Sequence, residues 1–169
     1  MAKKTVKARR KQANYMDIGS EDAPKIEFMG AGFKELDEEP QAKETGKRYI
    51  NDVSQTSSIS GYEWQTPFNA DQIVSEAVIK FILDIGKLQK TGEDCERDYF
   101  MVDLDEPVES KPNVFRARKQ RVAIQVEKFG ADDGEMTVEG NLLGQGDVIP
   151  GTFDVSQKKF TPDTATVGS

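Results

Sequence analysis

The segment from Val122 to Leu142 reads VAIQVEKFGADDGEMTVEGNL and carries the clearest structural signal in the chain. Its two halves alternate apolar and polar side chains, and this period of two places alternate residues on one face of a strand. The apolar positions are Val122, Ile124 and Val126 in the first half and Met136, Val138 and Leu142 in the second. Gly130 to Gly134 lies between them, and its glycine and aspartate residues tolerate the positive φ angles of a tight reversal. The segment therefore predicts a β-hairpin.

Further segments on both sides of this hairpin also favour strands. Tyr62 to Phe68 alternates apolar and polar side chains, which is typical of a strand with one buried face. Arg97 to Leu104 contains the apolar run Tyr99-Phe100-Met101-Val102, so we expect a strand that is covered on both faces. Val148 to Phe153 and Lys158 to Thr161 predict another strand pair, joined by the residues between them.

Residues 71–91 break the period of two. Their apolar side chains recur at spacings of one, three and four, which places them on one side of a helix. Asp71 is a suitable N-cap and Gly92 a suitable C-terminal stop, while Gly86 costs about 1 kcal/mol relative to alanine. We therefore predict an all-β domain: a β-sandwich or barrel of roughly seven or more antiparallel strands with one flanking amphipathic α-helix.

The charge of the chain is unevenly distributed. The net charge is −7, yet the first twelve residues hold six basic side chains and no acidic one: Lys3, Lys4, Lys7, Arg9, Arg10 and Lys11. We predict a basic N-terminal arm (1–24), a β-domain (25–161) and a flexible C-terminal tail (162–169). The arm either docks on an acidic surface or on nucleic acid, or it remains a disordered, solubilising segment. The acidic remainder of the chain would repel phosphates.

A long polar stretch, residues 37–48, separates two strand-like pieces. Loops of this length in a compact domain are usually functional or disordered. Two interpretations stay open: a mobile surface loop, or an arm that reaches a neighbouring subunit through its charged side chains. These side chains are Glu38, Glu39, Glu44, Lys47 and Arg48.

A second basic cluster, Arg116, Arg118, Lys119 and Arg121, lies within the otherwise acidic domain. It lacks interleaved exposed aromatic residues, which single-stranded nucleic-acid binding uses for base stacking. An inter-subunit salt-bridge surface fits the acidic surroundings better than nucleic-acid binding does.

Residues that usually carry catalysis are scarce. The chain has no histidine and one cysteine, Cys95, so the common general base, Ser-His or Cys-His pairs and ordinary zinc sites are excluded. Asp103, Asp105 and Glu106 are expected to form a solvated acidic strand edge. Cys95 follows acidic residues that would raise the pKa of its thiol. We expect no enzyme activity, no catalytic residue, no cofactor and no metal.

The location of the chain is suggested by two absences. No apolar run approaches the roughly 18 to 20 residues of a membrane-spanning helix, and the start does not resemble a secretory signal. A single cysteine fits assembly in a reducing cytoplasm. We expect a protein that does not act in a membrane.

Several segments, taken in order, resemble tail tube proteins of long-tailed bacteriophages. They are Arg48–Asp52, Ser58–Trp64, the helical stretch Phe81–Ile85 running into Lys90–Asp94, the strand Tyr99–Asp103, and Val122–Gly130 followed by Gly146–Asp154. The last of these, GDVIPGTFD, is similar to a closing phrase of such proteins from phages of Gram-positive bacteria. The resemblance covers roughly residues 26–161.

The resemblance implies a tube fold shared with the inner tubes of contractile systems. Subunits would join sheet edges into hexameric rings, and the rings would stack into the tail tube of a virion, assembled in the cytoplasm of the host bacterium. DNA would pass through without specific binding during ejection. Expected partners are further copies, a tape measure protein, tail terminator and baseplate proteins, and a sheath if the tail is contractile.

This reading assigns the charged residues to inter-subunit contacts. The set is Lys3, Lys4, Lys7, Arg9, Arg10, Lys11, Glu38, Glu39, Glu44, Lys47, Arg48, Arg116, Arg118 and Arg121. A baseplate or terminator component of the same fold would have a similar sequence. An alternative from another class is a monomeric β-sandwich module that binds carbohydrate or another surface, which would be expected to expose a cluster of aromatic side chains.

Overall fold

A computed structural model of the chain describes residues 5–20 and 22–163. Strands dominate this part of the chain and one α-helix accompanies them, so the predicted all-β class with a single helix is confirmed. The elements are η1 (Arg9–Lys11), β1 (Gln12–Asp17), β2 (Ile26–Phe28), β3 (Phe33–Leu36), β4 (Ala42–Lys47), β5 (Thr56–Tyr62), β6 (Gln65–Asp71), α1 (Ala77–Lys87), η2 (Gly92–Cys95), β7 (Glu96–Pro107), β8 (Val114–Asp132), β9 (Glu135–Gly144), β10 (Ile149–Asp154) and β11 (Lys159–Pro162).

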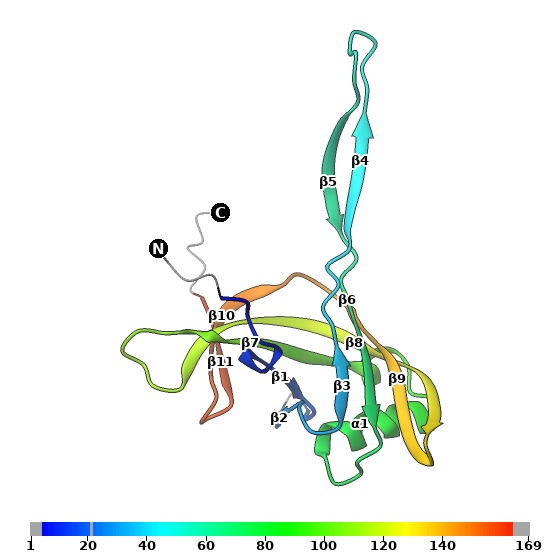
Figure 1. Cartoon of the computed structure of the whole chain (residues 1–169), viewed down its shortest axis with the longest axis vertical. Coiled ribbons are helices and arrows are strands. Elements are labelled where there is room, and N and C mark those ends of the chain that lie inside the picture. Colours follow the sequence, from blue (N-terminus) through cyan, green and yellow to red (C-terminus); the bar gives the residue numbers. More distant parts are fainter. Residues whose placement is uncertain (1–4, 21, 164–169) are drawn as a thin grey trace.

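Nine of the strands form one antiparallel sheet. Its order is β2-β1-β7-β8-β9-β6-β3, and β10 pairs with both β8 and β11. The 19-residue strand β8 is the central strand of the sheet, because its first half pairs with β7 and β10 and its second half pairs with β9. The remaining strands, β4 and β5, form a separate two-stranded sheet that projects from this body (Figure 1).

Strand β7 is buried on both faces, as its apolar run predicts. Tyr99 and Met101 belong to a large core that α1, β6, β8 and β9 complete. Phe100 and Val102 point to the other face, into a smaller core with Phe153 of β10. Because neighbouring strand residues point to opposite faces, one segment supplies both cores.

Strands β8 and β9 form the predicted hairpin. Asp132 pairs with Glu135, and the turn between them consists of Asp133 and Gly134, with φ angles of 50° and 83°. Two positive φ angles match the right-handed strand twist in a two-residue hairpin turn. The predicted pair β10–β11 is also present, and its turn is capped by the Asp154 carboxylate, which accepts hydrogen bonds from the backbone N–H groups of Ser156 and Gln157. The alternation around Tyr62–Phe68 continues to Ala70, although β6 begins only at Gln65.

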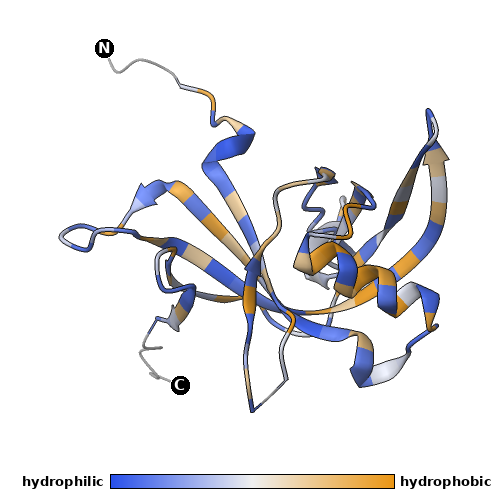
Figure 2. Cartoon of the chain, turned by 90° about the horizontal axis from the view of Figure 1, so that it is seen from below, coloured by the Kyte–Doolittle hydropathy of each residue, from blue (hydrophilic) through white to orange (hydrophobic). Residues whose placement is uncertain are grey.

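The helix is shorter than the predicted 71–91. Asp71 is not its N-cap, because β6 extends through Asp71, which pairs with Thr137 of β9. Gly92 is not its stop either, since α1 ends at Lys87 and Gly92 opens η2. In Figure 2, α1 shows alternating apolar and polar segments, as expected of a helix with one buried face.

Gly86 has a packing reason to lie within α1. A Cβ at this position would come within 2.7 Å of the Phe129 ring and of Val126 Cγ1 on β8. The glycine therefore allows the helix to approach the sheet closely, which offsets its low helix propensity.

The predicted 1–24 arm is wrong for its second half. Residues 12–17 form β1, which pairs with β7 and β2, and Tyr15 and Met16 are buried. A strand that pairs on both edges satisfies its backbone groups even where its sequence lacks a clean alternation. Residues 1–4 lie outside the described part, as do residues 164–169 of the predicted C-terminal tail, whereas Pro162 belongs to β11.

The predicted loop 37–48 is wrong for residues 42–47. Its second half forms β4, which pairs with β5 from Ala42↔Tyr62 to Lys47↔Thr56, with a bulge after Lys43. The pairing satisfies the backbone of a polar stretch whose composition alone favours a loop. In the described residues, no helix is long and apolar enough to cross a membrane.

Candidate functional site

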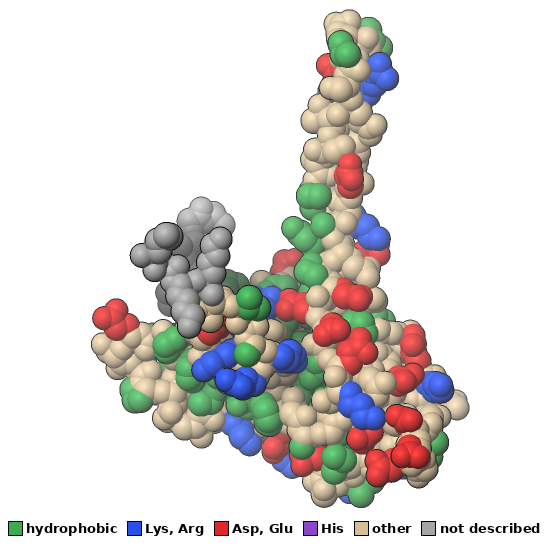
Figure 3. Space-filling view, viewed as in Figure 1, with side chains coloured by type: hydrophobic (Ala, Val, Ile, Leu, Met, Phe, Trp, Pro, Cys, Tyr) green, Lys and Arg blue, Asp and Glu red, His purple; other side chains and the backbone are tan. Residues whose placement is uncertain are grey.

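The β4–β5 hairpin is the most prominent surface feature of the chain. It rises from the body as a narrow ribbon with no other element beside it (Figures 1 and 3). From residue 42 to residue 62, only Asp52 and Gly61 are even half-buried. At its end, the turn exposes three large apolar side chains, Tyr49, Ile50 and Val53, of which Ile50 is 101% and Val53 95% exposed.

The two faces of the hairpin differ in chemistry. Directly paired residues share a face, so Ala42 and Tyr62 lie on one side together with Ile59, which pairs with Glu44. The opposite face carries Lys43 and Lys47, separated by Thr45. Figure 3 shows apolar side chains on one side of the lower hairpin and a basic side chain on the other. An apolar face without a covering element is typical of an interaction surface.

Glu38 anchors the root of the hairpin. Its carboxylate accepts two hydrogen bonds from the Arg118 guanidinium of β8, one of them 3.0 Å long, and a third from the indole Nε1 of Trp64 at 3.2 Å. Burial alone would lower the pKa of Arg118, but the hydrogen bonds and negative charge of Glu38 raise it above its ordinary value. A bidentate pair of this kind fixes the orientation of the Glu38 carboxylate relative to the Arg118 guanidinium as well as the distance between them.

The backbone at the root is also constrained. Glu39 and Gln65 exchange backbone hydrogen bonds of 2.8 and 3.0 Å, and the Gln65 side chain donates to the Glu39 carboxylate. Gln41 has a φ of 48°, in the left-handed region that non-glycine residues rarely adopt, and it accepts a hydrogen bond from the backbone N–H of Glu63. The hairpin is therefore held at a defined joint.

Three strands of the body keep one edge open. In the described part of the chain, β2 pairs only with β1, β3 only with β6, and β11 only with β10. A groove of about 620 Å³ separates β1 from β3, and a groove of about 650 Å³ separates β2 from β11, where Lys158 and Glu27 form an ion pair of 3.4 Å. Open edges are templates for pairing with another chain.

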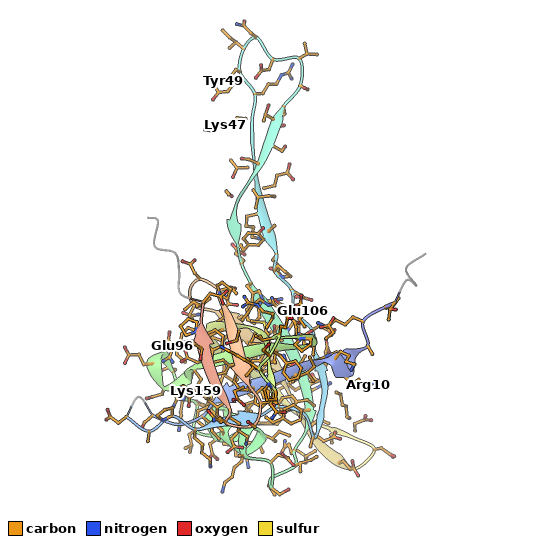
Figure 4. All side chains as sticks on the ribbon, turned by 90° about the vertical axis from the view of Figure 1, so that its left-hand side faces the viewer. Arg10, Lys47, Tyr49, Glu96, Glu106 and Lys159 are labelled. Atoms are coloured by element: carbon orange, nitrogen blue, oxygen red, sulfur yellow. The ribbon has the colours of Figure 1, made fainter. Side chains whose placement is uncertain are left out.

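The basic N-terminal residues lie against the body rather than at the hairpin. Lys7 contacts Asp103 at 2.7 Å and Asp105 at 3.0 Å, and Arg9 donates to Asn14 and to the backbone of Gln12. Burial would lower the pKa of Lys7, but the two carboxylates raise it, and the hydrogen bond from Lys7 lowers the pKa of Asp105. Arg10 and Lys11 are exposed, and Figure 4 places Arg10 beside the body, far from Lys47 near the end of the hairpin. Lys3 and Lys4 lie outside the described residues.

The basic cluster on β8 is occupied by partners within the same chain. Arg116 binds Asp163 through two hydrogen bonds, and Lys119 and Arg121 both contact Asp98. Of the predicted inter-subunit residues, the fold brings Glu38 and Arg118 together, whereas Glu44, Lys47 and Arg48 lie on the distant hairpin. Their inter-subunit role stays a prediction.

Cys95 and the acidic cluster on β7 are residues whose side chains could carry a reaction or bind a metal, and contacts within the chain account for both. Cys95 is buried and donates a hydrogen bond to the Lys90 carbonyl, and burial together with nearby Asp94 raises the pKa of its thiol. Asp103, Asp105 and Glu106 lie close together, and the Lys7 ammonium balances two of the three.

The sequence did not identify the apolar residues of the hairpin, Tyr49, Ile50 and Ile59, as candidate contacts. The available signal was weak: two Thr- and Ser-containing pieces flanking the turn-like Asn51-Asp52. The hydrogen bond between Trp64 and Glu38 was likewise not identified from the sequence.

Comparisons with known proteins give a likeness of structure rather than of sequence family. No protein-family model matches the chain, and no curated protein matches it. Among solved structures, it is similar to a chain in the cryo-EM structure of the anti-feeding prophage baseplate, 6-fold symmetrised. The TM-score is 0.48 and the sequence identity 10%, over 89% of this chain and 97% of that chain.

Proposed function

We propose that this chain is a non-catalytic structural subunit that self-assembles into stacked hexameric rings and so forms the tail tube of a virion. The observation that supports this proposal most is the exposed β4–β5 hairpin. A polypeptide segment that buries almost nothing in its own chain has its function in contact with something else.

The stability of the hairpin leads to the same proposal. An isolated two-stranded hairpin is at best marginally stable in water, because it has no core. The β4–β5 ribbon also contains Gly46, Gly61 and three serines, which contribute little cross-strand packing. Burial of its apolar face, with Ile59 and Tyr62, against a second molecule would supply the missing stabilisation.

A second copy of the chain is the partner that we propose. The open edges of β2, β3 and β11 offer lateral pairing around a ring, and the hairpin, which points away from the sheet, offers contact between rings. The net charge of −7 would let DNA slide through the tube without adhering to it. Tape measure, terminator and baseplate proteins would be the other partners in the tail.

Negative-stain electron microscopy and sedimentation velocity test the proposal. The wild-type chain should form rings or stacked tubes as its concentration rises. In a truncated variant, Asn-Gly replaces residues 45–58, so that Glu44 can still pair with Ile59 across a two-residue turn. This variant should remain folded and lose stacking.

Two results would count against the proposal. Tubes of normal length from the truncated variant would remove the stacking role of the hairpin. A wild-type chain that stays monomeric at every concentration and salt level would favour the monomeric binding module instead.

A further inference from the structure

The two ends of the molecule's long axis carry complementary surfaces. One end is the tip of the hairpin, which we define as Lys47, Arg48, Tyr49, Ile50 and Val53. The other is the foot, formed by the β8–β9 turn and the start of the β6–α1 connection, and defined as Val74, Phe129, Asp132, Asp133, Glu135 and Met136. Figure 1 shows the hairpin at the top of the long axis and these two connections at the bottom.

The foot is a preformed surface rather than a loose loop. Gln72 donates its backbone N–H to the Met136 carbonyl and its side-chain amide to the Thr137 carbonyl, which ties the β6–α1 connection to β9. The Phe129 ring lies over Gly86 of α1. Even so, Val74 remains 68%, Met136 50% and Phe129 37% exposed. The foot therefore presents apolar side chains at fixed positions.

The charges of the two ends are opposite and largely unbalanced. Within the part of the chain that the structure describes, Asp133 and Glu135 form no ion pair, and Asp132 reaches Lys34 only at 4.0 Å, because Lys34 is paired with Asp71 at 2.8 Å. The hydrogen bond to Asp71 is the main cause of the raised pKa of Lys34, and the charge of Glu135 is a smaller one. Lys47 and Arg48 likewise form no ion pair among those residues, although Arg48 Nε donates to the Asp52 carbonyl. Figure 3 shows acidic side chains gathered at the lower right of the body, where Figure 1 places the end of β8 and the start of β9.

We propose that the tip of one copy docks on the foot of the next copy, with Tyr49 and Ile50 against Met136 and Val74, and Arg48 near Glu135. This inference rests on the proposed self-assembly and names the surface that receives the hairpin. Because tip and foot are different surfaces, the contact is head-to-tail, and because they lie at opposite ends of the long axis, repeating it would extend a stack along that axis. Opposite charges at the two ends favour this orientation over tip-to-tip contact.

The groove between β1 and β3 fits the tip less well. It is apolar inside, but Arg9 and Arg10 line it. These cations would repel Lys47 and Arg48, whereas the foot attracts them. Both surfaces could accept the apolar side chains of the tip, but their charges favour the foot over the groove.

A charge exchange between the two ends tests the docking surface. Arg48→Glu and Glu135→Lys each replace an attraction with a repulsion, and both residues are exposed, so the fold should tolerate them. Each single variant should raise the concentration needed for stacking at least roughly 3-fold, and the double variant should recover most of the loss. Sedimentation velocity and electron microscopy measure stacking, and circular dichroism confirms folding.

The β7–β8 connection supplies matched controls. Lys111→Glu and Glu109→Lys reverse exposed charges on the flank of the body and should leave stacking unchanged. If both single tip and foot variants weaken stacking and the double variant does not recover it, the tip docks elsewhere; the inference then fails while self-assembly stands. Single variants that stack like the wild type would also overturn it. A wild-type chain that never associates would remove both the inference and the proposed function.

Discussion

Strand β7 and the β4–β5 hairpin are made of the same kind of backbone pairing and have opposite surroundings. β7 contributes Tyr99, Phe100, Met101 and Val102, all buried, to two cores. The hairpin has no buried residue. The comparison separates two tasks: β7 holds the fold together, and the hairpin is free to bind, because little of the free energy of unfolding depends on it.

The largest effect should come from truncating the two-faced strand. Met101→Ala deletes a fully buried side chain and should lower the free energy of unfolding by about 2–5 kcal/mol. Ile59→Ala, the matched change on the hairpin, should change it by less than about 0.5 kcal/mol. Urea unfolding of both variants measures the difference. Equal losses would mean that the hairpin packs on the body in solution.

The joint between the two regions should give an intermediate effect. Arg118→Ala leaves Glu38, whose side chain is only 22% exposed, without its guanidinium partner and should cost about 1–3 kcal/mol of stability. Arg116→Ala on the same strand breaks a more exposed pair and should cost less. Amide hydrogen exchange at Glu39 and Gln65, whose backbone N–H groups bond across the root, should quicken in the Arg118 variant only. Unchanged exchange there would contradict an anchoring role.

Alkaline pH should weaken the body through Tyr99. Burial raises the pKa of Tyr99 above its ordinary value of 10.0, so the unfolded chain releases this proton at a lower pH than the folded chain. The contribution of Tyr99 to the free energy of unfolding is therefore fully present below about pH 10. Above that pH it falls by about 1.4 kcal/mol per pH unit, until the pKa of Tyr99 in the folded chain is reached. Burial raises the pKa of Tyr15 too, so Tyr99→Phe should reduce the slope without abolishing it.

The hairpin provides the control for this pH dependence. Tyr49→Phe removes an exposed phenol and should leave the slope as in the wild type. Urea midpoints between pH 8 and pH 11 measure both variants. An identical slope in the Tyr99 variant would show that the buried phenol does not control alkaline stability.

The smallest effect should come from the exposed end of β7. Lys7→Ala removes the contacts with Asp103 and Asp105 and should slightly lower the melting temperature at low salt, with little change at high salt. Because the hydrogen bond from Lys7 lowers the pKa of Asp105, this contribution is present at neutral pH and is lost as the pH falls through that lowered pKa. Thermal unfolding at two salt concentrations checks it, and a salt-independent loss would indicate a packing role.

The elements that could be predicted from sequence are those whose own apolar pattern or turn residues indicate their burial and conformation. The apolar run of β7, the alternation of β8 and β9, and the Asp133-Gly134 turn each depend on local chemistry. Strand β1 could not be predicted in this way, because pairing with β7, more than 80 residues away, creates it. The start of α1 was misplaced since pairing with Thr137 extends β6 through Asp71.

The candidate site was predicted only in part. From its polarity, the stretch 37–48 was predicted to be a mobile surface loop or an arm, while its pairing with β5 depends on backbone hydrogen bonds that side-chain type hardly affects. The Glu38–Arg118 contact joins residues 80 positions apart. The sequence could therefore identify each residue as a candidate contact, but it could not show that the two bind each other.

The length of the hairpin makes it a lever. From Gln41 to Ile50 the chain spans nine residues, about 30 Å at the usual strand rise of about 3.3 Å per residue. A tilt of about 10° at Gln41 would then move Ile50 sideways by about 5 Å, roughly the spacing between neighbouring strands. Small angular errors at the root thus become whole-strand errors at the far end, which gives the short bonds among Glu38, Arg118 and Trp64 an influence well beyond their own stabilising energy.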